Sequence, residues 1–260
     1  MNLCISLSGF IFFLLGLSVG SFLNCIIYRL SVNEKPEGRS YCPKCKHNLS
    51  YKDLVPVFSY IFLLGKCRYC KKKISIEYPL VELLTGALFL LAFILVGTSV
   101  ELIFLLAVLF FFFLIFVYDL KHYIIPDFAN FSLIGISFLY LVFRTFMESN
   151  LDVLLYGLLS AFGAFLFFFS IFYFTKGKGM GFGDVKYVIF MGFFLGFPNI
   201  LAGLFISFVL GAIIGLVLIA AKRKKIKSQV PFGPFLIAGT LIAYFYGERI
   251  IETYLNHVFY

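Results

Sequence analysis

Long apolar runs separated by short polar segments make up most of this chain. Runs of this length predict helices that cross a lipid bilayer, because about 20 apolar residues span its hydrocarbon core. The runs cover Leu3–Ile27, Pro79–Val96, Leu102–Tyr118, Phe128–Phe143, Val153–Phe174, Val185–Phe197, Ile200–Ala221 and Phe232–Tyr246. The pattern therefore predicts an all-α polytopic membrane protein with about eight transmembrane helices.

The composition agrees with a chain that is mostly surrounded by lipid. Of its 260 residues, 62% are hydrophobic and only 13% are charged, and the mean hydropathy is +1.00. Such a chain cannot fold as a water-soluble globule, and the disordered, fibrous and secreted disulfide-rich classes are also excluded. The 37 Phe and 22 Gly residues, with no Trp, suit helices that pack closely in a bilayer.

The positive charge follows the expected membrane orientation. With the N-terminus outside, the segments 28–78, 119–127, 175–184 and 222–231 lie in the cytoplasm. All but two of the 22 Lys and Arg residues, Arg144 and Arg249, then fall on that side or at a helix end facing it. The positive-inside rule thus accounts for the net charge of +9, and no nucleic-acid partner is needed. The first run lacks the basic leader and cleavage site of a signal peptide, so we expect it to remain as an anchor in the inner membrane.

The run Val185–Phe197 is shorter than the others. Its roughly 13 residues extend about 20 Å, against about 30 Å for the hydrocarbon core. The Gly-rich sequence before it is therefore expected to lie below the membrane surface. At that depth its backbone must be buried in protein or line a wet cavity, because lipid offers no hydrogen-bond partners.

Four cysteines lie in the only sizeable polar segment. They form two CxxC pairs, Cys42 with Cys45 and Cys67 with Cys70. Two such turns can bring four thiolates together around a tetrahedral Zn²⁺ ion, and a segment of this size is too small to fold readily without a metal or another cross-link. We predict a small zinc-ribbon-like cytoplasmic insertion with structural zinc. A reducing cytoplasm argues against structural disulfides, and redox-active dithiols are the remaining alternative.

This insertion divides the chain into three predicted parts. Residues 1–28 form the first transmembrane helix, residues 29–78 the cytoplasmic double-CxxC zinc module, and residues 79–260 the transmembrane core. The lipid bilayer is the expected partner of the first and third parts.

Four acids stand in or beside the predicted helices on the cytoplasmic side: Glu82, Asp119, Asp127 and Asp184. A carboxylate at mid-helix costs about 2.5–3.5 kcal/mol on insertion scales, so each calls for a reason. Asp127 follows a proline just before an apolar run, where it can cap the free amides of the helix. For Glu82 three arrangements are open: reaching the interface, pairing with Lys71–Lys73, or serving a site beneath the cysteine module.

Asp119 and Asp184 suggest a paired-carboxylate site. Asp119 ends one run, and Asp184 closes the string GKGMGFGD, in which Gly181 and Gly183 let the backbone pass close to another segment. Two neighbouring carboxyls tend to share a proton, so that one deprotonates water while the other protonates a scissile carbonyl. This predicts peptide-bond hydrolysis. The string lacks the GKS or GKT end of a phosphate-binding loop, and a hinge or close helix packing is the remaining alternative for its glycines.

Several longer strings resemble the bacterial type IV prepilin peptidases, which are leader peptidases and N-methyltransferases of the GxGD aspartic protease group. They are GSFLNCIIYRL at 20–30, the two CxxC pairs, GKCRYC followed by ISIEYPLVELLTG up to residue 86, YDLKHYIIPD at 118–127, GMGFGDVK at 179–186 and PFGPFL at 231–236. Together they extend over nearly the whole chain. Archaeal preflagellin peptidases and presenilin-like proteases share GxGD, but the former lack the cysteine module and the latter carry PAL where this chain has PFGP.

The resemblance implies roles for individual residues. Asp119 and Asp184 correspond to the catalytic pair, and the supporting positions are Gly181, Gly183, Asp127 and Lys186. It also implies type IV prepilin or pseudopilin substrates, cut at the cytoplasmic membrane face just before an apolar helix. The new N-terminus would be methylated from S-adenosylmethionine, and Gly65 and Glu82 are the candidate methyltransferase positions by this analogy alone.

A membrane transporter or channel with a cytoplasmic metal-binding module is the alternative function. Such a protein needs acids or other polar residues distributed through the bilayer as an ion path. Here the conspicuous acids gather at one face, and the outer halves of the runs are nearly bare. The sequence therefore favours the peptidase.

Overall fold

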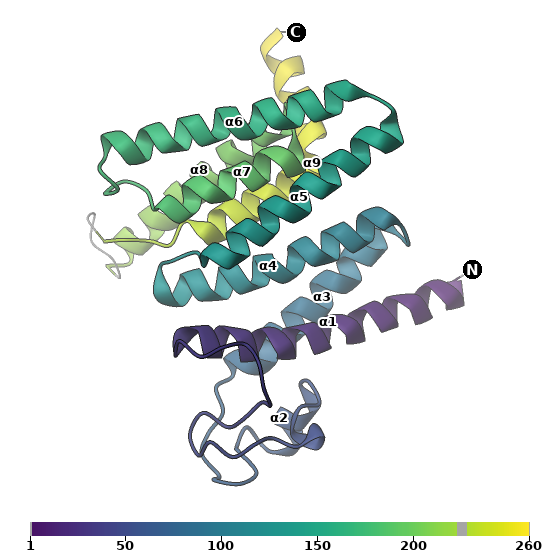
Figure 1. The fold of residues 1–260 in the computed structure, drawn as a ribbon, viewed down its shortest axis with the longest axis vertical. Coiled ribbons are helices and arrows are strands. Elements are labelled where there is room, and N and C mark those ends of the chain that lie inside the picture. The colour runs from purple at the N-terminus through teal and green to yellow at the C-terminus, as the bar shows by residue number, and fades with distance from the viewer. Residues whose placement is uncertain (1, 223–227, 260) are drawn as a thin grey trace. The chain divides into compact units, whose positions relative to one another are not determined.

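The computed structural model describes residues 2–222 and 228–259 (Figure 1). Within these residues the chain forms nine α-helices and one short 3-10 helix, η1 (Tyr51–Asp53). The helices are α1 (Asn2–Ser31), α2 (Phe58–Phe62), α3 (Glu77–Val96), α4 (Val100–His122), α5 (Asp127–Glu148), α6 (Leu151–Phe174), α7 (Phe182–Leu195), α8 (Asn199–Ala220) and α9 (Gly233–Phe259). The all-α prediction is confirmed.

In the part of the chain that the structure describes, six helices are long and apolar enough to cross a membrane: α1 from Leu7 onward, α3, α4, α5, α6 and α8. The chain is therefore a multi-pass membrane protein. The other two predicted runs also form helices, but α7 has only 14 residues. The second half of α9 carries three charged residues, Glu248, Arg249 and Glu252.

The observed helices differ from the predicted runs most at the end of α9, and α1, α4 and α5 also continue four or five residues past their predicted ends. α7 begins at Phe182, before the predicted start at Val185, so Gly183 and Asp184 lie in its first turn instead of in a loop. α9 continues to Phe259, well past the predicted end at Tyr246. Charged residues end a membrane run in the sequence, but they do not end a helix.

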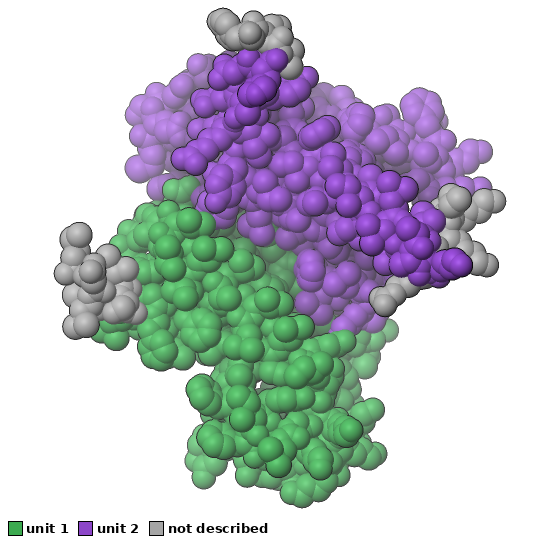
Figure 2. Space-filling view, turned by 180° about the vertical axis from the view of Figure 1, so that it is seen from behind, with its two compact units in different colours: residues 1–114 green, residues 115–260 purple. Residues whose placement is uncertain are grey.

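The chain divides into two compact units, residues 1–114 and 115–260 (Figure 2). In the first unit α1 packs along α3, and the cysteine segment lies between these helices in the sequence. Glycines make the approach close. A Cβ added to Gly16 would lie 2.7 Å from the Cα of Gly86, and one added to Gly20 would lie 2.7 Å from the Cα of Glu82. Small residues thus allow close helix packing here, as the glycine content suggested.

In the second unit α7 is the central helix. It packs against α5 and α6 and also contacts α8 and α9. Most of its side chains are buried, including Tyr187, Phe190 and Met191. Gly192 permits a close approach to α6, since an added Cβ would lie 2.2 Å from the Cα of Ala161. Neighbouring helices therefore cover α7, which explains how so short a helix can be so apolar.

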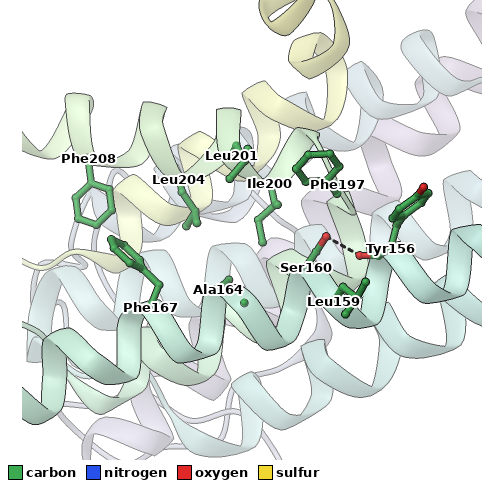
Figure 3. A pocket seen from close by; sticks show the side chains of 11 residues that line it. Tyr156, Leu159, Ser160, Ala164, Phe167, Phe197, Ile200, Leu201, Leu204 and Phe208 are labelled. Atoms are coloured by element: carbon green, nitrogen blue, oxygen red, sulfur yellow. Dashed lines mark hydrogen bonds between the residues drawn. The ribbon is translucent and has the colours of Figure 1, made fainter.

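An apolar hollow of about 680 Å³ lies between α6 and α8 (Figure 3). Ala164 and Phe167 line it from α6, and Leu204 lines it from α8. The hydroxyl of Ser160 in its wall is already used, because it donates to the carbonyl of Tyr156 at 2.6 Å. The hollow therefore offers a ligand mainly apolar contact.

Candidate functional site

The four predicted metal ligands form one cluster. The Sγ atoms of Cys42, Cys45, Cys67 and Cys70 all lie within 4.8 Å of one another, and those of Cys42 and Cys70 are 4.0 Å apart. Sulfurs around a tetrahedral ion with Zn–S bonds of about 2.3 Å would be about 3.8 Å apart. All four cysteines are free thiols. The cluster therefore has the donor set and the spacing that fit a Zn²⁺ ion.

Backbone hydrogen bonds give the two CxxC turns the same shape. The amide of Lys46 donates to the carbonyl of Cys42 at 2.8 Å, and the amide of Lys71 donates to that of Cys67 at 3.0 Å. Both lysines have a positive φ, 59° and 58°, and one isolated β-bridge closes each turn. The module is thus built from two copies of one turn, a repeat that the amino-acid letters do not make obvious.

Asp53 joins the two halves of the module, although no sequence motif marks it. Its carboxylate accepts hydrogen bonds from Arg68 Nε at 2.7 Å and from the Tyr69 hydroxyl at 3.1 Å, both within the second CxxC turn. It also accepts from the amide and hydroxyl of Ser50. Burial alone would raise the pKa of Asp53, but the hydrogen bonds from Arg68 and Ser50 lower it to about 2. Asp53 therefore stays ionised while it ties η1, which follows the first CxxC turn in the sequence, to the second turn.

The thiol of Cys42 is well prepared to bind a cation. Burial raises the pKa of this thiol, but hydrogen bonds from the backbone amides of Cys45 and Lys44 outweigh burial and lower the pKa to about 7. The thiolate is the form of cysteine that binds metals. The turn thus favours the thiolate of Cys42. In the same turn, the backbone amide of His47 lowers the pKa of Cys45, but burial and the neighbouring thiols of Cys42 and Cys70 outweigh that amide and raise the pKa to about 11.

Asp119 lies near the end of α4, which continues to His122. Its side chain is buried, and its Oδ2 accepts a hydrogen bond from the backbone amide of Gly233, at 3.0 Å. Gly233 is the first residue of α9, within the string PFGPFL. A Cβ added to Gly233 would lie 2.7 Å from the same oxygen. The absence of a side chain at this position is therefore what lets the backbone reach the carboxyl.

Asp184 lies in the first turn of α7 and is also buried. Its Oδ2 accepts a hydrogen bond from the backbone amide of Gly181, the N-cap residue, at 3.2 Å. The N-terminus of a helix carries partial positive charge, so a buried carboxylate is tolerated better here than at mid-helix. Asp119 and Asp184 are thus each held through one oxygen by the amide of a glycine.

These two carboxyls belong to one site. They interact electrostatically with each other. Their surroundings meet at Ile125: a Cβ added to Gly183 would lie 3.1 Å from Ile125 Cβ, and one added to Gly233 would lie 3.4 Å from Ile125 Cδ1. The structure therefore brings Asp119 and Asp184 together, although they are far apart in the sequence.

Asp127 does not cap α5, so that prediction is wrong. The helix begins at Asp127 itself, its N-cap is Pro126, and no side chain among the described residues caps it. Instead, Asp127 Oδ1 accepts a hydrogen bond from Lys186 Nζ on α7. Lys186 also lies over the rings of Phe131 and Phe182. The ion pair between two predicted supporting residues thus joins the start of α5 to the start of α7.

Asn130, which the sequence did not single out, provides a second link between these helices. It is fully buried in α5, and its Nδ2 donates to the carbonyl of Gly183 at 3.1 Å, next to Asp184. A carbonyl can only accept, so the amide nitrogen must face it. The Oδ1 of Asn130 has no hydrogen-bond partner in the described part of the chain. Burying an amide in this way is costly, which suggests a use other than stability.

Glu82, a residue of α3, contacts the start of α2, and Gly65 follows the end of α2. The carboxylate of Glu82 is buried, and its Oε2 accepts a hydrogen bond from the amide of Val57, the N-cap of α2, at 2.7 Å. This hydrogen bond joins Glu82 to the segment between the two CxxC turns. That Glu82 serves a site there stays a prediction. Gly65 follows α2 with a φ of 66°, and an added Cβ would lie 3.0 Å from the Tyr60 hydroxyl. The two methyltransferase candidates thus border the same short helix.

Two family models match the chain, one after the other. The bacterial Peptidase A24 N-terminal domain matches residues 14–96, and the type IV leader peptidase family matches residues 104–216. No solved structure matches the chain.

Relatives match over nearly their whole length. The prepilin leader peptidase/N-methyltransferase of Bacillus subtilis (strain 168) is 35% identical over 247 residues, covering 95% of this chain and 97% of that protein. The proteins of the same name from Legionella pneumophila and Pseudomonas aeruginosa are 34% and 30% identical, over 94% of this chain in each case and 93% and 92% of their own lengths. The chain therefore belongs to the type IV leader peptidase family.

Proposed function

We propose that this chain removes the leader peptide from type IV prepilins or pseudopilins at the cytoplasmic face of the bacterial inner membrane and then methylates the new N-terminus. Full-length similarity to relatives named for both activities supports the assignment. The observation that carries the peptidase is the burial of Asp119 and Asp184 in one site, each with one carboxyl oxygen held by a glycine amide.

Asp119 and Asp184 are the proposed catalytic residues. Two neighbouring carboxyls shielded from water cannot both ionise easily, so they hold one proton between them. The ionised carboxyl takes a proton from water, whose oxygen attacks the scissile carbonyl carbon, while the protonated carboxyl gives its proton to the carbonyl oxygen. The tetrahedral intermediate then collapses: the first carboxyl returns its proton to the leaving nitrogen as the C–N bond breaks, and the second takes back a proton from a hydroxyl.

The surrounding contacts position this pair. The amides of Gly233 and Gly181 occupy Oδ2 of each aspartate, which leaves the Oδ1 atoms to act on water and substrate. The Asp127–Lys186 ion pair and the Asn130–Gly183 hydrogen bond hold the first turn of α7 against α5. Such contacts fix a reactive geometry before substrate binds, which is worth more than the same groups on a mobile loop.

The Gly233–Asp119 contact also supports eight membrane crossings. Asp119 is near the end of α4 and Gly233 begins α9, so their contact requires both helix ends to lie on one side of the membrane. An even number of crossings must then separate them. α5, α6 and α8 supply three, so we propose that α7 crosses as the fourth and that α9 completes a total of eight, with the N-terminus outside.

The cysteine module would hold Zn²⁺ through Cys42, Cys45, Cys67 and Cys70. The ion would supply folding energy to a small domain and would take no part in hydrolysis. S-adenosylmethionine is the proposed methyl donor. Gly65 and Glu82 are the candidate positions for the methyltransferase: Glu82 on α3 bonds to the N-cap of α2, and Gly65 follows the end of the same helix.

A single assay tests both activities. The purified full-length chain is incubated in lipid vesicles with a prepilin and with S-adenosylmethionine carrying a labelled methyl group, and the product's mass and N-terminal residue are read. We expect loss of the leader and gain of one labelled methyl group at the new N-terminus. A chain that is folded and zinc-loaded but cuts neither prepilins nor pseudopilins would contradict the proposal.

A further inference from the structure

The segment between the two CxxC turns exposes an unusual number of large apolar side chains. We call residues 54–64, which include α2, the α2 tip. Phe62 is 82% exposed and Leu64 is 84% exposed. The other large apolar residues exposed on the tip are Leu54, Val55, Phe58 and Ile61. In water such a patch is unfavourable, and contiguous exposed apolar residues mark a surface that contacts a partner or a membrane.

The backbone conformation at Leu64 supports the same conclusion. Leu64 has a φ of 50°, at the left-handed position that follows a short helix. Glycine or asparagine is preferred there, because other residues pay a steric cost. In water, a leucine whose side chain is almost fully exposed gains no free energy of burial that would offset this steric cost. The position makes sense if the side chain contacts an apolar medium.

The hydrogen bond from Val57 to Glu82 fixes the depth of the tip. Glu82 lies about 8 Å along α3 from its first residue, at 1.5 Å per residue. α3 is a candidate membrane span that begins at Glu77. The start of the α2 tip therefore lies beside the first two turns of a membrane helix. This is the level of the boundary between lipid head groups and acyl chains, where interfacial helices lie about 5–10 Å deep.

The charges around the tip match a lipid surface. Exposed lysines flank it on both sides, Lys52 before it and Lys66 after it, and a β-bridge brings Lys73 beside Lys66. The nearby acid, Asp53, is occupied by its ion pair with Arg68. Basic residues next to an apolar tip attract the anionic head groups of the cytoplasmic leaflet.

We propose that the α2 tip inserts into the cytoplasmic leaflet, with its apolar side chains among the acyl chains and its lysines against anionic phospholipid head groups. The α2 tip then anchors the cysteine module to the membrane surface, in addition to α1 and α3. Neither the peptidase nor the methyltransferase is needed for this inference. A second copy of the chain or the apolar helix of a substrate would cover the tip with protein instead.

The lack of tryptophan in the chain makes the test direct. The Phe62→Trp variant carries a single tryptophan, and the full-length protein is placed in vesicles of phosphatidylcholine and phosphatidylglycerol with bromine at defined acyl-chain depths. The control is Lys44→Trp, an exposed position in the first CxxC turn outside the tip. We expect several-fold stronger quenching at position 62 than at position 44, strongest for shallow bromines. In phosphatidylcholine alone the quenching at position 62 should fall.

A charge in the tip provides the second comparison. In the Phe62→Trp background, Leu64→Asp should reduce quenching strongly, whereas Lys44→Asp should leave it unchanged, with zinc content measured to show that both fold. Equal quenching at positions 62 and 44 overturns the proposal. So does a blue-shifted emission at position 62 that bromine does not quench, because protein then covers the tip. Quenching at position 62 that is equally strong with and without phosphatidylglycerol overturns the role of the lysines.

Discussion

The backbone amide of Gly233 donates a hydrogen bond to Oδ2 of Asp119, 3.0 Å away, although 114 positions separate the two residues. The contact joins the start of α9 to the end of α4 and occupies one oxygen of a carboxyl that the proposed mechanism needs. It gives the PFGPFL string a physical role, because glycine alone leaves room for the carboxyl at this distance.

Replacing Gly233 by alanine should therefore impair leader cleavage. The new Cβ would lie 2.7 Å from Asp119 Oδ2 and must displace it. A catalytic group misplaced by about 1 Å can cost about 100-fold in rate. Cleavage of a prepilin by Gly233→Ala is measured beside Gly135→Ala in α5, where an added Cβ meets nothing within 4 Å. Equal activity of the two variants would show that the Gly233 contact is dispensable.

Asn130→Asp should lower the rate of cleavage and leave substrate binding nearly unchanged. The variant keeps the shape of the side chain, but its carboxyl cannot donate to the Gly183 carbonyl while it is ionised, and holding it neutral instead requires a proton that the amide does not need. We expect kcat to fall by roughly tenfold or more, equivalent to about 1.4 kcal/mol, with little change in KM. Asn150→Asp is the matched control, because Asn150 caps α6 through its side-chain oxygen and aspartate caps equally well. A parallel loss in both variants would mean a general electrostatic effect.

The zinc module should depend on Asp53 equally at pH 7 and pH 5. The pKa of Asp53 is lowered to about 2, so its stabilising effect is complete above its ordinary pKa of 3.8 and is lost only as the pH falls through 2. Acidification releases zinc earlier, by protonating the thiolates. Asp53→Asn should therefore speed zinc loss to a chelator by a similar factor at both pH values. If the difference from the unchanged chain disappears at pH 5, Asp53 is protonated there and its hydrogen bonds do not hold it ionised.

Gly65→Ala should separate the two proposed activities. The substitution combines a φ of 66° with an added Cβ 3.0 Å from the Tyr60 hydroxyl, so the end of α2 must rearrange. We expect loss of methyl transfer with most leader cleavage retained. Gly97→Ala has a similar φ of 72° but meets nothing within 4 Å, which controls for backbone strain alone. If Gly65→Ala methylates normally, this end of α2 does not serve the methyltransferase.

Much of the fold follows from the sequence because each apolar run is long enough to form a helix by itself. The four-cysteine cluster and the convergence of Asp119 and Asp184 were also predictable, since few residue types suit metal binding or paired acid–base chemistry. The roles of Asp53 and Asn130 were not, because each depends on a partner brought near by folding: Arg68 for one and the Gly183 carbonyl for the other. The cap predicted at Asp127 was wrong for the same reason, because Lys186 binds that carboxylate from another helix.

The most direct measurement of the central claim is leader cleavage by Asp119→Asn and Asp184→Asn. Asparagine keeps the size of aspartate but cannot ionise or share a proton, so either change should abolish release of the leader. Each variant should still hold zinc and methylate a pilin that has already been cut. Asp152→Asn, at an exposed acid in the first turn of α6, should cleave normally. Leader release by the double variant at a rate close to that of the unchanged chain would contradict the account.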